Sequence, residues 1–277
     1  MEEIGILTLS LIITNGIVSY KGLNDFTFFN KFSFNIDQIL VTKDYKRLIT
    51  SGFLHADWTH FGFNMITLYF FSRGLESSVG FFSFLILYFV SLLGGNLFAL
   101  YIHRNHPDYT AIGASGAISG LIFASIGLFP GMEIGFILLP IYIPAWLYGM
   151  AYVLYSIYGI KSQKDNIGHE AHLGGGIVGL LTAIILNPNI MTTNYLPIIL
   201  IIIPTFTFLF FIIKKPHLLI IENPFSKSKK AFTIEDKYNF DKVAKQKELD
   251  KILDKINKKG YDKLTKKEKD KLNELSK

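Results

Sequence analysis

The chain has 277 residues and a mass of 31.4 kDa, half of its residues are hydrophobic, and its mean hydropathy is +0.34. This composition excludes a disordered polymer, a collagen and a disulfide-stabilised secreted module. Because the chain contains no cysteine, thiolate nucleophiles, redox-active thiols and cysteine-based zinc sites are excluded as well.

The net charge of +6 is concentrated in the C-terminal part of the chain. Residues 223–277 hold 17 lysines and 10 acidic residues, whereas residues 1–222 hold 11 basic and 12 acidic residues. Lysines with interleaved acids are typical of a solvated charged helix, and this pattern argues against nucleic acid as a partner. A weak contact with an anionic lipid surface remains compatible with it.

Long uncharged intervals divide the nearly neutral part into segments of membrane-spanning length. A bilayer core of about 30 Å requires roughly 20 apolar residues in a helix, and lipid offers an irregular backbone no hydrogen bonds. The pattern predicts an all-α, polytopic membrane helix bundle with seven spans, near residues 4–20, 58–74, 80–102, 113–130, 143–160, 170–187 and 195–213.

The expected organisation has five parts. They are a first transmembrane helix (1–20), a structured interfacial loop (21–57), core helices 2–6 (58–187), a seventh transmembrane helix (188–215) and a Lys-rich, small soluble helical tail (223–277). A cleaved signal peptide is the alternative for the first part, but Glu2 and Glu3 are acidic where a signal peptide is basic.

Two connections have their own expected structure. Residues 131–144 contain Pro140 and Pro144 and predict an apolar loop, so that the fifth helix begins near Ala145. In the tail, apolar residues recur at helical spacing, and Thr265 with Glu268 forms a capping box, which predicts a helical hairpin.

Three segments place polar residues where a helix enters the lipid, and polar groups there are costly unless they serve a function. The first contains His60 and Asn64, which are four residues apart and share one helical face. The second is Gly113-Ala114-Ser115-Gly116, and the third contains His172.

These segments open helices 2, 4 and 6, and successive spans cross the bilayer in opposite directions. Ser115, His60 and His172 are therefore expected at a similar depth on one side of the membrane. A serine hydroxyl needs a base within hydrogen-bond reach to become a nucleophile, and histidine is the usual base. An Asn amide, a second histidine and backbone N–H groups can stabilise the oxyanion of an acyl-transfer intermediate.

Small residues are expected to let helices 4 and 6 approach each other. Gly175, Gly179 and Ala183 repeat every four residues and begin about one turn after His172. Glycines on both sides of Ser115 also allow a substrate backbone to come close.

Together these motifs resemble the rhomboid family of intramembrane serine proteases. The resemblance covers residues 45–187 and rests on the order of His60-x-x-x-Asn64, Gly113-Ala114-Ser115-Gly116 and Ala171-His172-x-x-Gly175-x-x-x-Gly179. It implies a six-helix rhomboid core, to which the seventh helix and the tail are added.

The resemblance also implies roles for single residues. Ser115 would be the nucleophile and His172 its general base, in a dyad without an acidic third member. His60, Asn64 and the backbone N–H of Ser115 would form the oxyanion hole. The supporting residues would be Gly113 beside that hole, Gly116, Gly175 and Gly179 in the helix packing, and Glu76, which would brace the loop and helix ends.

The chain departs from the family pattern at two places. Lys46-Arg47 stands where a Trp-Arg pair often marks the first loop. Ser119 stands four positions after the nucleophile, where an aromatic residue commonly packs on the base, so something else must orient His172.

Rival interpretations are a metal site, a transporter and a scaffold. His169-Glu170-x-His172 has its histidines three apart rather than four, which does not fit a zincin helix. A transporter would need midplane ionisable residues and paired repeats, and neither is visible. The main alternative is a catalytically silent rhomboid-like scaffold that binds membrane proteins without cutting them.

The sequence therefore predicts a serine-type endopeptidase that cleaves transmembrane segments of membrane proteins in the lipid bilayer. No cofactor and no metal are expected, and no feature specifies an oligomeric state. Because most loop lysines and arginines fall on the active-site face, the positive-inside rule would make that face cytoplasmic. The resemblance implies the reverse and is followed here: a multi-pass plasma-membrane protein (inner membrane in a bacterium) with the active site opening to the extracytoplasmic face.

Overall fold

A computed structural model describes residues 4–136, 139–162 and 167–214, together with the single residues Lys255, Thr265, Lys269 and Leu272. By internal contacts the chain divides into two units, residues 1–221 and residues 222–277. The helical hairpin expected in the tail lies outside the described residues.

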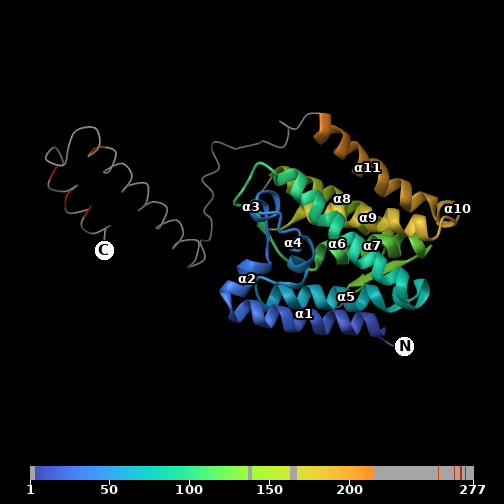
Figure 1. Cartoon of the computed structure of the whole chain (residues 1–277). Helices are drawn as coiled ribbons and strands as arrows, with labels where there is room; N and C mark the ends of the chain where they lie inside the picture. Colours follow the sequence, from blue (N-terminus) through green and yellow to red (C-terminus); the bar gives the residue numbers. More distant parts are fainter. Residues whose placement is uncertain are drawn as a thin grey trace. The chain divides into compact units, whose positions relative to one another are not determined.

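The described part of the first unit is mainly helical, as predicted (Figure 1). The helices are α1 (Ile6–Asn24), α2 (Phe26–Phe32), α3 (Ile36–Leu40), α4 (Arg47–Thr50), the 3₁₀ turn η1 (Ser51–Phe53), α5 (Trp58–Val79), α6 (Phe81–His103), α7 (Ser115–Leu128), α8 (Ala145–Ser162), α9 (His169–Leu186), α10 (Ile190–Thr193) and α11 (Tyr195–Lys214). The strands are β1 (Phe34–Asn35), β2 (Thr110–Ala111), β3 (Glu133–Phe136) and β4 (Leu139–Pro144).

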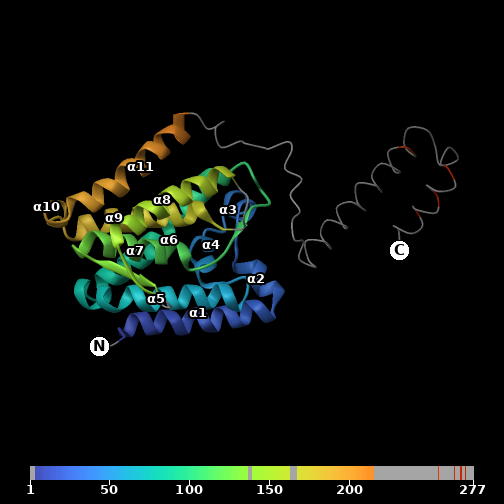
Figure 2. The same cartoon turned by 180° about the vertical axis from the view of Figure 1, so that it is seen from behind.

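The long helices form a bundle around α7. Every residue from Gly116 to Gly127 is buried, and α7 packs against α5, α6, α8 and α9. The short helices α2, α3 and α4 gather at one end of the bundle and α10 at the other, as the front and back views show (Figures 1 and 2). A helix that is apolar on all sides and enclosed in this way can present only its ends to water.

Local sequence explains where these helices begin and end. The Asp57 carboxylate accepts the backbone N–H of His60 at 2.7 Å and so caps α5. Gly80 has φ +79° and separates α5 from α6, because a left-handed residue cannot continue either helix. The segment Asn187-Pro188-Asn189 ends α9 and leads into α10.

Glycines allow α7 and α9 to come into backbone contact. A Cβ added at Gly175 would overlap the carbonyl oxygen of Gly116, and one added at Gly179 would overlap that of Gly120. A Cβ at Gly116 would lie 3.2 Å from the carbonyl oxygen of Ala171. The small-residue repeat therefore lies in the helix contact for which the sequence predicted it.

The segment between α1 and α5 contains short helices and is organised around Arg47. This side chain is 6% exposed, and its Nη1 donates to the carbonyl oxygens of Asn30 and Ser33, both at 2.7 Å. Its Nε donates to the carboxylate of Asp44 at 3.0 Å. Because one buried cation satisfies three acceptors from separate turns, the segment is held together without a tryptophan before Arg47.

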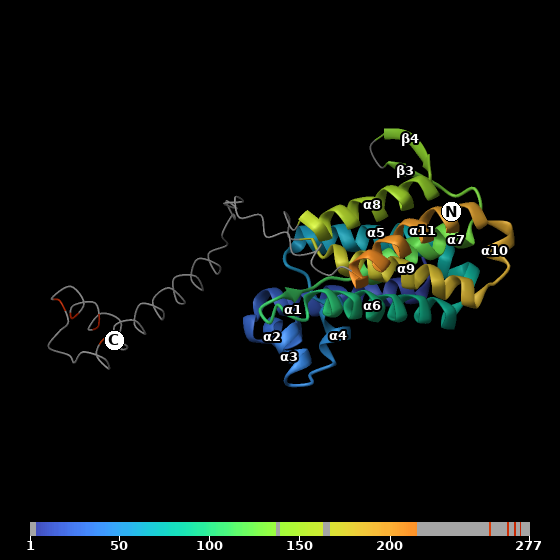
Figure 3. The same ribbon diagram turned by 90° about the horizontal axis from the view of Figure 1, so that it is seen from above.

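Two small antiparallel pairs of strands add to the helical architecture. β1 pairs with β2, and β3 pairs with β4 in the register Glu133 to Pro144 and Ile134 to Ile143. Residues 131–144 were expected to form an irregular apolar loop, but the strands pair their backbone groups with each other in a hairpin beside α8 (Figure 3). The fifth long helix, α8, begins at Ala145 as predicted.

Four helices in the described part are long and apolar enough to cross a membrane: α1, α6, α9 and α11 through Ile212. The shorter α7 is also apolar. Helices lie at all seven positions where the sequence predicted a span, since α5 and α8 occupy the two positions not yet mentioned.

The close contact of α7 and α9 predicts different effects on the melting temperature for two glycine substitutions. Gly179→Ala should lower the apparent melting temperature, with a loss of about 1–3 kcal/mol in the free energy of unfolding, because a methyl group cannot fit against a backbone carbonyl. Gly62→Ala in α5 is the matched control, because nothing lies within 4 Å of its added Cβ. Thermal unfolding in detergent measures both. Equal melting temperatures for the two variants would contradict the packing argument.

Candidate active site

The structure brings Ser115 and His172 into direct contact. Nε2 of His172 lies 2.7 Å from Oγ of Ser115, although the two residues are 57 positions apart. Ser115 is the first residue of α7, and His172 lies in the first turn of α9. Both side chains are partly exposed, so the contact is accessible from the end of the bundle.

The turn before α7 brings the His60 side chain toward Ser115. Gly113 has φ +119°, and its N–H donates to the carbonyl oxygen of Ser51 at 3.0 Å. A Cβ at Gly113 would lie 2.9 Å from Cε1 and Nε2 of His60 and 3.6 Å from Oγ of Ser115. Glycine is therefore required both for the backbone conformation and for the close approach of the imidazole.

Asn64 lies one turn after His60 on α5. It is buried, and its amide donates to the carbonyl oxygen of His60 at 2.9 Å. The N-terminus of a helix carries a partial positive charge, and α7 begins at Ser115. A hydroxyl in hydrogen-bond contact with an imidazole can act as a nucleophile in acyl transfer.

The carboxylates nearest in sequence to His60 and His172 have partners of their own. Asp57 caps α5, and the carboxylate of Glu170 lies 3.0 Å from Nε2 of His103, with both residues 5% exposed. The ring of Tyr109 stacks on His103 at 3.6 Å, and burial together with the charge of Glu170 raises the pKa of the Tyr109 hydroxyl.

Tyr152 on α8 is a site residue that the sequence analysis missed. Its ring stacks on His172, and its hydroxyl lies 2.8 Å from Oγ of Ser119. Nothing in the sequence around it differs from the other tyrosines of α8, because Tyr148, Tyr155 and Tyr158 recur in the same helix. Only the packing of α8 against α9 distinguishes it.

Glu76 lies far along α5 from His60 and acts at the N-terminus of α1. Its carboxylate accepts the N–H groups of Leu7 and Thr8, both at 2.9 Å, and the hydroxyl of Thr8 at 2.7 Å. A Cβ at Gly5 would overlap this carboxylate. The expected bracing of helix ends by Glu76 thus takes the form of a cap on the first helix.

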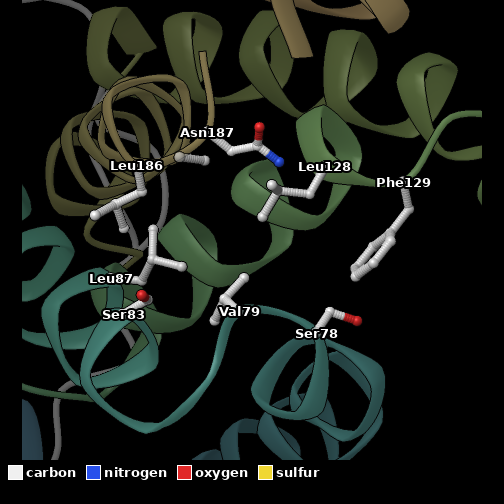
Figure 4. A pocket seen from close by; sticks show the side chains of 9 residues that line it. Ser78, Val79, Ser83, Leu87, Leu128, Phe129, Leu186 and Asn187 are labelled. Carbon is white, nitrogen blue, oxygen red and sulfur yellow. The ribbon is translucent and has the colours of Figure 1, made fainter. Parts of the chain in front are cut away.

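No group of three or more His, Cys, Asp or Glu side chains capable of holding a metal ion occurs among the described residues. A cavity of about 260 Å³ lies at the other end of α7 (Figure 4). Side chains from the ends of α5, α7 and α9 and the start of α6 enclose it, including Val79, Leu87, Leu128 and Asn187. It is separated from Ser115 by the length of α7 and does not belong to the candidate site.

Comparison with known proteins places this geometry in a family. A model described as "Rhomboid domain" matches residues 42–189, and one described as "Family of unknown function (DUF6576)" matches residues 232–277. Because the first match covers more than half of the chain and contains Ser115 and His172, the chain belongs to the rhomboid family.

Three relatives illustrate the similarity. Rhomboid protein 1, mitochondrial, of Saccharomyces cerevisiae is 32% identical, covering 52% of this chain and 43% of that protein. RHOMBOID-like protein 12, mitochondrial, of Arabidopsis thaliana is 30% identical over 63% of this chain and 56% of that protein. Rhomboid protease AarA of Providencia stuartii is 30% identical over 55% and 60%, respectively. The chain thus spans about half the length of these relatives.

These relatives correct one expectation. The sequence analysis assigned the chain to the plasma membrane with the site opening to the extracytoplasmic face. Four of the similar proteins are mitochondrial by name, and two of these are the yeast and Arabidopsis thaliana proteins described above. The other two are RHOMBOID-like protein 6 of Arabidopsis thaliana and a presenilin-associated rhomboid-like protein of Danio rerio. The plasma-membrane assignment is therefore wrong. That assignment was inferred from the family resemblance, but the rhomboid fold serves in different membranes. Neither the charge bias nor the resemblance therefore identifies the membrane.

His55, beside the candidate site, predicts a pH-dependent loss of stability. It is fully buried, its Nδ1 lies 2.8 Å from Oγ of Ser19, and its ring lies edge-on to His60. Burial lowers the pKa of His55 to about 3, and the neighbouring His60 adds to this effect. Between pH 6.5 and 3 the unfolded chain therefore binds a proton at His55 that the folded chain does not bind. The free energy of unfolding then falls by up to about 1.4 kcal/mol for each unit by which the pH is lowered.

Replacing the imidazole tests this assignment. In His55→Gln the drop in melting temperature between pH 7.5 and pH 5 should be smaller than in the wild type, because the titrating group is gone. Thermal unfolding in detergent at the two pH values gives each drop. An identical drop in both proteins would show that His55 titrates normally in the folded state.

Proposed function

We propose that this protein is an intramembrane serine endopeptidase that cleaves transmembrane segments of membrane proteins through a Ser115–His172 dyad. The single observation that carries the proposal is the 2.7 Å contact between Oγ of Ser115 and Nε2 of His172. The similarity to a rhomboid protease of Providencia stuartii supports the same activity. We further propose that six helices (α1, α5, α6, α7, α8 and α9) form the transmembrane core and that α11 is a seventh span.

The proposed reaction proceeds by acyl transfer. Oγ of Ser115 attacks the carbonyl carbon of the scissile peptide bond while Nε2 of His172 takes the hydroxyl proton. The tetrahedral intermediate collapses when His172 gives that proton to the leaving amine. A water molecule then attacks the acyl-enzyme with His172 again as base, which releases the acid product and restores the Ser115 hydroxyl.

The negative oxygen of the intermediate needs preorganised donors. We assign this role to the imidazole of His60, the amide of Asn64 and the backbone N–H of Ser115. The approach of His60 to Gly113 supports the assignment, and so does the buried position of Asn64 one turn further along α5. In a site that excludes bulk water each such donor contributes about 3–4 kcal/mol to transition-state stabilisation.

A transmembrane substrate must unwind before it can react, because a helix uses its own carbonyl groups in hydrogen bonds. We therefore expect small or helix-breaking residues near the cleaved bond. No step of the mechanism uses a metal or a cofactor. The catalytically silent scaffold is the alternative function, and it predicts binding of the same membrane proteins without cleavage.

Substitution of the nucleophile separates the two functions. Ser115→Ala should reduce cleavage of a transmembrane reporter by at least about 10³-fold, and His172→Ala by a similar factor, while both still bind the reporter. Cleavage in proteoliposomes and co-purification of the reporter are the two measurements. EDTA should leave the wild-type rate unchanged.

Ser125→Ala is the matched control, since Ser125 is a buried serine of the same helix whose hydroxyl donates to the carbonyl oxygen of Leu121. It should retain full activity. Reporter binding without cleavage by the wild type would favour the scaffold, and undiminished cleavage by Ser115→Ala would refute the dyad.

A further inference from the structure

The proposed base depends on the orientation of its imidazole ring. A base that must accept a proton at one nitrogen and return it at the same place requires a fixed ring orientation. The aromatic groups packed against the ring of His172 contribute to that orientation.

Tyr152 contacts the face of this ring from α8. The ring centroids of Tyr152 and His172 are 6.1 Å apart, and their planes differ by 25°, which is an offset stack. Phe123 from α7 holds the tyrosine ring at 5.7 Å and Tyr148 from α8 at 5.9 Å. The stacking partner of His172 is therefore itself fixed on two sides.

The hydroxyl of Tyr152 is held by a hydrogen-bond chain that returns to the nucleophile. Oγ of Ser119 donates to the carbonyl oxygen of Ser115 at 2.8 Å, which uses its only proton. The 2.8 Å contact between Ser119 and Tyr152 must then have the tyrosine hydroxyl as donor. Tyr152 thus contacts His172 through its ring and is tied to the backbone of Ser115 through Ser119.

From this geometry we propose that Tyr152, oriented by Ser119, is a positioning residue for the general base. The proposal rests on the proposed function, because it assigns to Tyr152 and Ser119 the orientation of His172 in the proposed Ser115–His172 dyad. It also explains how a small residue can stand four positions after the nucleophile: Ser119 leaves space for an aromatic ring from α8 and supplies the hydrogen bond that sets its plane. Tyr152 does not touch the substrate in this role and acts through His172.

Kinetics of four variants in proteoliposomes test the proposal. Tyr152→Leu, which removes the stack, should lower kcat by about 10- to 100-fold with KM unchanged, because a misplaced base loses rate rather than binding. Tyr152→Phe and Ser119→Ala, which remove only the hydrogen bond, should each lower kcat by about 2- to 5-fold. The double variant Tyr152→Phe/Ser119→Ala should be no slower than the slower single variant, because both changes break the same bond.

Tyr158→Leu is the matched control on the same helix, since Tyr158 is 58% exposed. It should keep the wild-type kcat, and melting temperatures of all variants should be compared so that misfolded protein is recognised. If Tyr152→Leu folds and keeps the wild-type kcat, or if the two single changes multiply in the double variant, the proposal is overturned. Labelling of wild-type Ser115 by a fluorophosphonate probe distinguishes failure of the positioning role from failure of the proposed function. A labelled, active wild type with an unaffected Tyr152→Leu refutes the positioning role alone, whereas an unreactive wild type refutes the proposed function and this proposal together.

Discussion

The close approach of α7 and α9 is the constraint on which the candidate site depends. Ser115 and His172 stand at the starts of these two helices, and a 2.7 Å contact between their side chains requires helix backbones that nearly touch. Gly175 and Gly179 make this possible, because any side chain there would overlap a carbonyl oxygen of α7. Since lipid provides no hydrophobic force to drive helices together, such close packing must itself hold the pair.

Three charged side chains inside the described part of this apolar chain have specific partners. Arg47 satisfies two carbonyl oxygens and Asp44, Glu76 caps α1, and Glu170 faces His103. These pairs occupy helix ends and connections, where the backbone also has unmet hydrogen bonds. As a result, these charged side chains stabilise the helix ends and connections around the candidate site.

Family membership identifies the class of protein but does not establish its activity or its membrane. The rhomboid match covers the helices that present Ser115, His60 and His172, whereas residues 232–277 match a family of unknown function. The relatives include proteins named as mitochondrial and a protein named as a protease. The proposed chemistry depends on the geometry of Ser115 and His172, and the fold does not determine which membrane the protein occupies.

The positions of the long helices, the three polar segments and the glycine repeat could be predicted from the sequence, because each depends on hydropathy, spacing or residue size within one segment. The hairpin of β3 and β4 could not, since two apolar segments with prolines give no strong alternating pattern. Tyr152 also could not, because its contacts with His172 and Ser119 join three different helices and its own helix contains four similar tyrosines. The sequence by itself determined which segments are apolar helices and which of them carry the candidate serine and histidines. The tertiary structure alone decided which aromatic ring packs on His172 and which partners Glu76 and Glu170 take, because those contacts depend on how neighbouring helices pack.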